Sequence, residues 1–545
     1  MKVTRLRAPS HDGGLLAAPS LDQAVALVDA NARRAAAWEY DFQGRPARWL
    51  SSAVRRQAVE ASREFLAEIG LSSPVSPGEG SGDLDDLVVT GHQPEMFHPG
   101  VWVKNFAAAG IAARRGSVAL NLVIDDDIPK SASIRVPYRE DGRLVVRRME
   151  FDRWEGEAPY EDLPVRDEET FATFGVRVQE ALDGLVEEPL VEDYWPEVAR
   201  YRESGFPLGL RLAAARRRIE SAWGIENLEV PFSRLCQTEG FQWFASHLLA
   251  HLPRFQAVHN QALREYRALY GIRSKNHPVS ALKSEGDWLE APFWVWRSGR
   301  PRRRPLMVRQ DARTMHLRIS GEPEPFLELP LAPDREACCA VERLMELRAT
   351  DVRLRTRALT TTMFSRFLLS DLFIHGIGGA KYDELGDAIA LRFFNAKPPA
   401  FLTLSLTSWM GLPESAGSPS ALADLERELR GIEYNPDRYL LDRPTPEEAA
   451  LITEKRLLQS EDPMDPGRRR DRFRRFRAIN EALTARVTGR ADELRSRRSR
   501  LQFEIEQNRL ARSREYALVL HPKEHLRSRL MTLCQDVGAT TEESL

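Results

Sequence analysis

Two segments of this sequence each read as a short apolar strand, a polar loop and a helix, and this pattern most constrains the fold. The first runs from Leu87 to Ala113 and the second from Leu372 to Phe394. Each apolar run is short and does not alternate with polar residues, which is typical of a parallel strand buried on both faces. Parallel strands need crossover helices, so the pattern predicts an α/β fold with a mostly parallel, doubly wound sheet.

The chain between and around these segments changes character several times. Apolar runs at 118–124 and 401–406 predict two further strands of the same sheet, and short strands and long helices fill the interval between the segments. We therefore expect six parts: a helical lead at 1–82, the first half of a Rossmann-like core at 83–130, an inserted α+β region at 131–332, the second half of the core at 333–412, a helical or coiled-coil arm at 413–515, and a C-terminal segment at 516–545.

Composition excludes several classes of protein. The 78 Lys and Arg residues balance 80 Asp and Glu residues, so the net charge of −2 gives no overall attraction to nucleic acid or to an anionic membrane. Four cysteines without a CxxC pattern predict neither a disulfide framework nor a zinc ribbon. The apolar stretches are shorter than the ~20 residues that cross a bilayer, so we expect a cytoplasmic protein.

The polar loop of the first segment carries the strongest local signal. It lies between a strand and a helix, where parallel sheets bind ligands and where helix N–H groups favour anions. Glycine allows close backbone approach, histidine can transfer protons near neutral pH, and a lysine one turn into the helix can counter charge. The alternative is a turn whose histidines satisfy backbone groups. The predicted catalytic residues are His92, His98 and Lys104, and the predicted substrate-binding residues are Gly91, Gln93 and Gly100.

Three acids follow the next predicted strand directly: Asp125, Asp126 and Asp127. Adjacent carboxylates repel one another unless a cation or a hydrogen-bond donor compensates. They are therefore candidates to hold Mg²⁺ or to bind the amine or hydroxyls of a substrate. The alternative is a solvated acidic turn.

The loop of the second segment is rich in glycine and again ends at a helix N-terminus, where backbone N–H groups can wrap an anion. The loop of the first segment contains neither GxxxxGK[ST] nor GxGxxG, so it matches no standard phosphate motif. Another candidate substrate loop holds Asn276 and His277, although Asn-His-Pro also forms plain turns. In the second loop we expect Lys381 to be catalytic and the following residues to bind substrate or nucleotide: His375, Gly376, Gly378, Gly379, Tyr382 and Asp383.

The chain towards the C-terminus predicts a long helix. Apolar residues recur at helical spacing from Phe476 to Ile505, which predicts a helical hairpin or coiled coil whose uncovered stripe forms a homodimer. Residues 467–514 also hold 16 Arg against 6 acids. A nucleic-acid-binding scaffold is thus an alternative, but a solvated helix face is the preferred interpretation.

These loops resemble those of the bacillithiol biosynthesis cysteine-adding enzymes, the cysteine ligases of that pathway. The resemblance lies in Thr90-Gly91-His92-Gln93 with Gly100 and Lys104, in the acids 125–127, in part of the stretch 378–382, and in a closing segment at 516–530. It implies a Rossmann-like core related to nucleotidyltransferases and class I aminoacyl-tRNA synthetases, and a coiled coil used for dimerisation. The reaction it implies joins the carboxyl group of cysteine to the amine of a glucosaminyl malate.

We therefore expect a ligase that joins an amino-acid carboxyl group to the amine of a small sugar-derived acceptor, with ATP or ADP and Mg²⁺ as candidate ligands. Two alternatives remain besides the nucleic-acid scaffold. One is a non-catalytic nucleotide- or sugar-binding protein, and the other is a nucleotidyltransferase-like enzyme with a different substrate.

Overall fold

A computed structural model describes residues 6–75, 86–273, 279–440, 444–460 and 465–539. The chain divides into two compact units. Unit 1 combines Met1–Tyr138, Arg147–Met410 and Arg514–Leu545, and unit 2 combines Arg139–Val146 with Gly411–Ser513.

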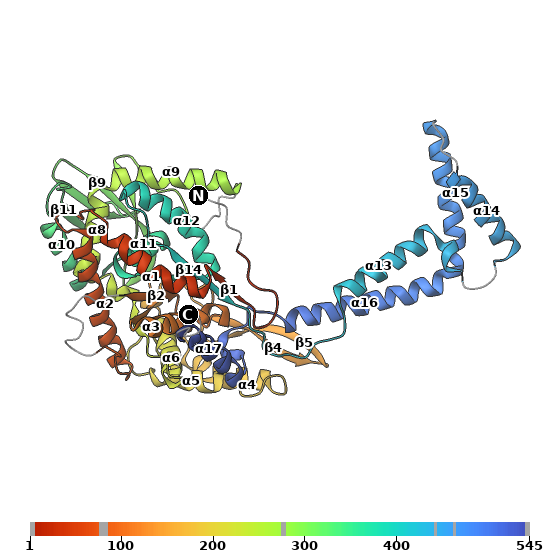
Figure 1. The fold of residues 1–545 in the computed structure, drawn as a ribbon, viewed down its shortest axis with the longest axis horizontal. Helices are drawn as coiled ribbons and strands as arrows, with labels where there is room; N and C mark the ends of the chain where they lie inside the picture. The colour runs from red at the N-terminus through yellow and green to blue at the C-terminus, as the bar shows by residue number, and fades with distance from the viewer. Residues whose placement is uncertain (1–5, 76–85, 274–278, 441–443, 461–464, 540–545) are drawn as a thin grey trace, which may run out of the picture. The chain divides into compact units, whose positions relative to one another are not determined.

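The centre of unit 1 is a six-stranded mixed sheet (Figure 1). Five neighbouring strands run parallel, and β1 joins the edge antiparallel to β14. Leu87, Val88 and Val89 are fully buried, as expected for a strand covered on both faces. The prediction of an α/β fold is thus confirmed. The strand order is β1 (Leu15–Ala18), β14 (Phe401–Leu406), β13 (Leu372–His375), β2 (Leu87–His92), β3 (Val118–Val123) and β6 (Leu228–Pro231).

The strand β6 comes from the stretch predicted to be an insertion. Its four residues pair in parallel with β3, so the central sheet takes a strand from between 131 and 332. A run of four residues is too short to show a periodicity, which is why the sequence pattern does not reveal it.

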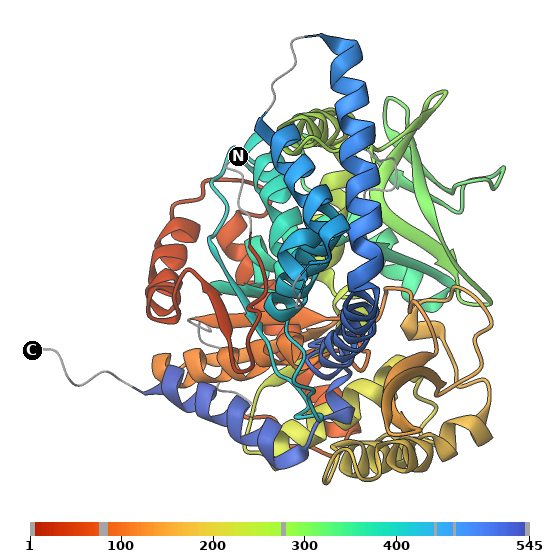
Figure 2. The same cartoon turned by 90° about the vertical axis from the view of Figure 1, so that its right-hand side faces the viewer.

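Helices pack on both faces of the central sheet. Leu87 and Val89 of β2 share a core cluster with Val59 and Phe65 of α2 (Ala47–Glu68). On the other face α3 (Pro99–Arg115) packs on β2, β3 and β14, and α17 (Lys523–Gly538) runs alongside it (Figures 1 and 2). At Gly110 of α3 a side chain would meet the backbone of Cys534, so glycine permits this close approach.

A second, antiparallel sheet belongs to the same unit. Its order is β11 (Leu327–Pro330), β10 (Thr314–Ile319), β9 (Arg300–Gln310), β8 (Trp288–Arg297) and β12 (Val352–Thr356), with β7 (Ser284–Glu285) paired to β8. β4 (Ser133–Glu140) and β5 (Arg143–Glu150) form a separate hairpin.

The remaining helices of unit 1 surround these sheets. They are α1 (Leu21–Ala36), α4 (Glu168–Leu182), α5 (Val191–Arg200), α6 (Leu208–Ala222), α7 (Phe232–Leu235), α8 (Glu239–Ala250), α9 (Leu252–Tyr270), α10 (Cys338–Met345), α11 (Ala358–Phe364) and α12 (Ile377–Phe393).

Unit 2 is helical and differs from the prediction in two respects. The predicted continuous helix is interrupted by a 3-10 turn at Ala485–Val487, which separates α15 (Pro466–Thr484) from α16 (Thr488–Ala511). The helix α13 (Pro419–Tyr434) packs on α16, and Leu494 is buried in the cluster that they share. Because α13 is absent from the prediction, the stripe that we expected to be uncovered is in part covered by the unit itself. The other helix of this unit is α14 (Pro446–Ser460).

None of the described helices is both long enough and apolar enough to cross a bilayer.

Candidate functional site

A cavity of about 740 Å³ lies in unit 1 at the carboxyl ends of β2 and β13. These two strands are parallel neighbours, but the chain leaves them in opposite directions: β2 leads through α3 to β3, and β13 leads through α12 to β14. Helices that depart to opposite sides leave a crevice between the strand ends, where α/β sheets bind ligands. The three predicted segments contribute to its walls through Gly91, His92, Gln93, His98, Gly100, Lys104, Asp126, Asp127, His375, Gly376, Gly378, Gly379 and Tyr382.

The α3 side of the cavity is closely packed. The strand β2 extends through His92, so Gly91 is part of the strand and not of the predicted loop. At Gly100, in the first turn of α3, a side chain would overlap the carbonyl oxygen of Leu406 and the guanidinium of Arg514. Glycine at this position therefore lets α3 begin directly against the end of β14.

His98 and His92 are both neutral near pH 7. His98 caps α3, because its Nδ1 accepts a hydrogen bond from the Gly100 N–H at 3.1 Å, so the ring proton lies on Nε2. His92 Nδ1 lies 3.2 Å from the carbonyl oxygen of Gln93. Burial lowers the pKa of His92 to about 3 and that of His98 to about 4. A neutral imidazole donates a hydrogen bond through its one N–H group and accepts one at the other nitrogen, but it does not act as an acid near pH 7.

Lys104 reaches back from α3 to β2. Its Nζ donates to the carbonyl oxygen of Gly91 at 2.7 Å, and the residue is 3% exposed. Burial, together with the charge of Arg216, lowers the pKa of Lys104 to about 7. Its amine is therefore far easier to deprotonate than that of an exposed lysine.

The three acids that follow β3 point in different directions. Asp125 accepts hydrogen bonds from the N–H and hydroxyl of Ser233, at 2.9 and 2.5 Å, and lines a separate cavity of about 730 Å³. Asp127 accepts from Gln93 at 2.8 Å and pairs with Arg303 at 2.9 Å. Burial and the neighbouring acids raise the pKa of Asp126 well above its usual range.

The three acids do not converge on a Mg²⁺ site by themselves. Asp127 is already neutralised by Arg303, and Asp125 is satisfied by Ser233. Among the residues that the structure describes, no group of three or more His, Cys, Asp or Glu side chains is placed to hold a metal ion. The acids are better explained as a hydrogen-bonded corner of the cavity.

On the other side of the cavity, α12 begins earlier than predicted. Gly376 is its N-cap and Gly378 and Gly379 lie in its first turn, so these glycines belong to the helix and not to a wrapped loop. Within the described chain no side chain caps this end. The first turn of α12 lines the cavity, and N–H groups at an uncapped helix end can bind an anion.

His375 is held by a buried carboxylate beside that helix end. Its Nε2 lies 2.6 Å from Asp383, which also accepts from Arg366 at 2.6 Å and from Thr362 at 2.7 Å. Arg366 and His375 outweigh the effect of burial and hold the pKa of Asp383 below its usual range, while burial lowers the pKa of His375. Nδ1 of the ring faces Gly379, where an added side chain would come within 2.7 Å. The pair can form a base, and His375 lines the cavity.

Two predicted residues, Lys381 and Asp383, are placed differently, and two others lie outside the described residues. Lys381 is exposed and is not part of the cavity wall, because a helix that begins at Ile377 turns residue 381 outward and residues 382 and 383 inward. Asn276 and His277 lie outside the described residues. Asp383 supports His375 and does not line the cavity itself.

A cationic wall of the cavity is absent from the predicted site. Arg357 and Arg303 lie over the ring of Trp294, with their guanidinium carbons 4.1 and 5.4 Å from its centroid, and all three line the cavity. Arg357 also donates to Glu290 at 2.6 Å. An aromatic residue at strand spacing, such as Trp294, more often belongs to a core than to a pocket. Trp294, Arg303 and Arg357 are far from the polar loops in the sequence. No local sequence pattern therefore connects them to the same site.

Comparison with known proteins gives no matching family model and no matching curated protein.

Proposed function

We propose that this protein is a ligase of the bacillithiol cysteine-adding type, with its active site in the cavity between β2 and β13. One observation carries the proposal: the cavity combines an uncapped, glycine-rich helix end, a buried lysine and two arginines with an Asp-supported histidine. Anion-binding groups and a base in one enclosed space suit the transfer of an activated acyl group to an amine. The five parallel strands and the crevice between β2 and β13 also favour a Rossmann-like core.

The anionic part of the activated acid would lie on the first turn of α12. The positive charges of Lys104, Arg303 and Arg357 would compensate its negative charge. Backbone N–H groups at a helix N-terminus and buried cations both stabilise phosphate oxygens. A cavity of about 740 Å³ has the size of known nucleotide and drug sites. ATP or ADP is therefore a ligand of suitable size and charge.

His375 would act as the base of the acyl transfer. The amine nitrogen attacks the activated carboxyl carbon, a C–N bond forms, and the bond from that carbon to the phosphate oxygen breaks so that phosphate leaves with the electron pair. The proton lost by the amine goes to His375 Nδ1. Asp383, bonded to Nε2, stabilises the imidazolium that results.

The proposal is tested by incubating the protein with ATP, cysteine and an amino-sugar acceptor and following the consumption of all three. We expect ATP and cysteine to be consumed only when the acceptor is present, and the His375→Ala variant to lose turnover. ATP binding without any cysteine-dependent turnover would instead support the non-catalytic nucleotide-binding alternative.

We further propose a homodimer through the arm formed by unit 2. Since Leu494 is buried by α13, the contact surface we propose includes Leu457 of α14 and Phe473 of α15, which are 62% and 69% exposed. Light scattering should give twice 61.9 kDa for the wild type and 61.9 kDa for the Leu457→Glu/Phe473→Glu variant. A wild-type mass of 61.9 kDa at micromolar concentration rules this out.

The Arg-rich stretch of unit 2 gives less support to a nucleic-acid scaffold. Arg475, Arg486, Arg490 and Arg512 form ion pairs with acids from outside the stretch 467–514: Glu454, Glu448, Glu428 and Glu414. These pairs reduce the local excess of positive charge that binding to phosphates would need.

A further inference from the structure

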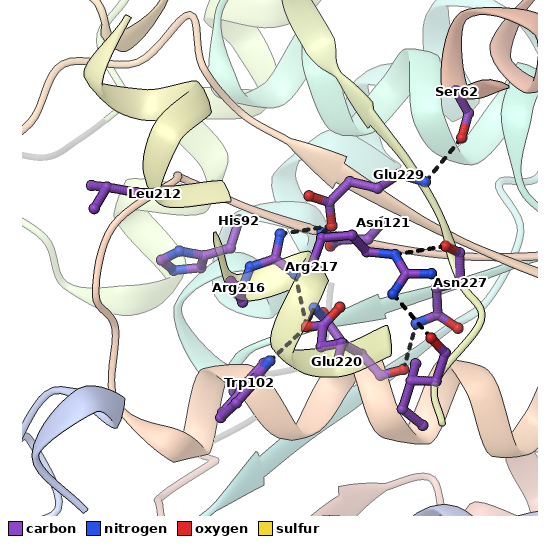
Figure 3. A network of polar contacts seen from close by, with 12 residues as sticks. Ser62, His92, Trp102, Asn121, Leu212, Arg216, Arg217, Glu220, Asn227 and Glu229 are labelled. Atoms are coloured by element: carbon purple, nitrogen blue, oxygen red, sulfur yellow. Dashed lines mark hydrogen bonds and ion pairs between the residues drawn. The ribbon is translucent and has the colours of Figure 1, made fainter. Parts of the chain in front are cut away.

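A buried ionic network contacts α3 through Trp102 (Figure 3) and through Asn105. The indole N–H of Trp102 and the amide of Asn105 both donate to the same oxygen of Glu220, at 2.6 and 2.7 Å. Lys104 lies between these two residues in the sequence, and its amine is bonded to Gly91 on the cavity wall. The backbone that carries Lys104 is therefore fixed by contacts made beneath the cavity.

Arg216 of α6 is the centre of this network. Its guanidinium bridges Glu220 and Glu229 with two contacts of 2.7 Å, and Asn121 donates to Glu229 at 2.6 Å. Both glutamates are completely buried. An arginine held by two buried carboxylates keeps its charge, and the two contacts fix the place of its guanidinium.

The groups around Lys104 oppose a second positive charge. Arg216 of α6 is the charged group that disfavours the ammonium form of Lys104, and the lysine in turn lowers the pKa values of His92, His98 and His375. Within the described part of the chain, Lys104 forms no ion pair with a carboxylate, and its hydrogen bond goes to a backbone carbonyl. Burial adds to the cost of the ammonium form, because the charge loses its hydration.

An anion in the cavity would reverse this balance. Lys104 lines the same cavity as the first turn of α12, where the proposed function places phosphate oxygens. A phosphate dianion near the amine favours the ammonium form strongly in a buried site. The charge of Lys104 therefore depends on whether the cavity is filled.

We propose that Lys104 takes up a proton from solvent when a phosphate-bearing anion enters the cavity, and that Arg216 is the positioning residue that opposes the charge on this amine while the cavity is empty. The new bond is the third N–H bond of Lys104 Nζ. The inference rests on the proposed function, since it needs the anion site. It adds a coupling between the ligand and a proton, which makes binding of the anion depend on pH in a specific way.

The test is calorimetric titration of the full chain with ATP in two buffers of different ionisation enthalpy, at pH 6, 7 and 8. The dependence of the measured heat on the buffer gives the number of protons taken up. Because the pKa of Lys104 in the free protein is about 7, we expect uptake of about 0.1 proton at pH 6, about 0.5 at pH 7 and about 0.9 at pH 8. The Lys104→Met variant should lose this uptake at pH 8. Any uptake that this variant still shows measures the protons taken up by the histidines and by ATP itself.

Two variants test Arg216 separately from Lys104. In Arg216→Gln/Glu220→Gln the cation is removed together with one of the two carboxylates that it bridges, and Glu229 keeps its hydrogen bond from Asn121. Uptake at pH 8 should fall by half or more because Lys104 is already charged. Arg217→Gln is the matched control: this buried neighbour donates to the carbonyls of Ile225 and Asn227, and its loss should leave uptake unchanged. If the double variant does not fold, Glu229→Gln gives the opposite sign, since Arg216 is then less neutralised and uptake at pH 7 should rise above the wild-type value.

The outcomes separate this inference from the proposed function. If ATP does not bind to the wild type, the proposed anion site is wrong. If ATP binds with the same heat in both buffers at pH 8, the site stands and the proton coupling is wrong. Unchanged uptake in the double variant, or in Glu229→Gln when the double variant does not fold, would overturn the role of Arg216.

Discussion

The helices α3 and α12 both begin at the cavity, but their N-termini are capped differently. The first turn of α3 is capped by His98, and its Gly100 is pressed against the carbonyl of Leu406. In α12 the N-cap is Gly376, and a side chain at Gly376 or Gly378 would meet open space. The N-terminus of α3 is thus capped by a side chain of the protein, whereas no described side chain caps that of α12. In the proposed function this difference makes the α12 end the anion site.

The largest effect should come from the carboxylate that orients the base on the α12 side. In Asp383→Asn the amide can no longer fix the tautomer of His375 or stabilise its charged form, and we expect turnover to fall by about 10³-fold. The measurement is the rate of ATP-dependent cysteine consumption at saturating substrates.

Asp387→Asn is the matched control for that change. Asp387 binds the same arginine, Arg366, at 2.7 Å, but Asp383 is the carboxylate that contacts His375. We expect less than about a fivefold loss, since a partly screened ion pair contributes about 1 kcal/mol or less. An equal loss in both variants would assign the effect to Arg366 and not to the base.

The next effect separates two adjacent glycines of α12. A methyl group at Gly379 would lie 2.7 Å from His375 Nδ1, so Gly379→Ala should displace the ring and weaken both ATP binding and turnover by about 10- to 100-fold. Gly378→Ala meets nothing within 4 Å, and it should leave ATP binding within about threefold while stabilising the helix by about 0.5–1 kcal/mol. Equal losses in the two variants would show that the helix end needs flexibility and not space.

The sequence revealed the strands of the core better than the contacts of the site. Leu87–Val89 and Leu372–Ile374 are apolar without interruption because both faces of these strands are buried, and that pattern is visible in sequence. The order of strands and loops in the sequence also placed the polar loops correctly at one edge of the sheet. The exact ends of β2 and α12 differ from the prediction, because glycine signals a turn but is equally compatible with a strand end or a first helical turn.

Other features of the site depend on tertiary structure alone. The pairing of His375 with Asp383 follows from where α12 begins, which decides that residue 383 and not Lys381 faces inward. Arg303 and Arg357 reach the cavity from β9 and from the end of β12, far from the loops in sequence. The division of Asp125 and Asp127 between two cavities depends on Ser233 and Arg303, which no local pattern connects to them.

A stability effect should distinguish the α3 side. The side chain introduced by Gly100→Ala would overlap a backbone carbonyl that cannot rotate away, so we expect a loss of about 3 kcal/mol in the free energy of unfolding. Urea denaturation followed by tryptophan fluorescence measures it, with Gly378→Ala as the control on the α12 side. A loss below about 0.5 kcal/mol would mean that α3 can shift, and that its N-terminus is less fixed than the comparison requires.

The smallest effect concerns the pH dependence of stability on the α3 side. Burial lowers the pKa of His92 in the folded protein to about 3, whereas the unfolded chain has the ordinary value of about 6.5. The unfolded state therefore binds a proton first as the pH falls below about 6.5, so the stability that His92 contributes is complete above that pH and is lost progressively towards about 3. Between pH 7 and pH 5 full linkage amounts to about 2 kcal/mol, and solvent in the cavity reduces this to about 1 kcal/mol.

His92→Gln keeps a polar side chain at the end of β2 but removes the titration. The wild type should therefore lose about 1 kcal/mol more than this variant when urea denaturation is repeated at pH 7 and pH 5. His247→Gln serves as the comparison, because burial also lowers the pKa of His247 to about 3, but this histidine is bonded to Tyr40 and does not line the cavity between β2 and β13. With ATP present the two should differ: an anion in the cavity makes a charged His92 less unfavourable and shrinks its pH effect, while that of His247 stays the same. If ATP changes the pH effects of His92 and His247 on stability equally, the ligand does not interact with the α3 side. In that case only the α12 side belongs to the binding site.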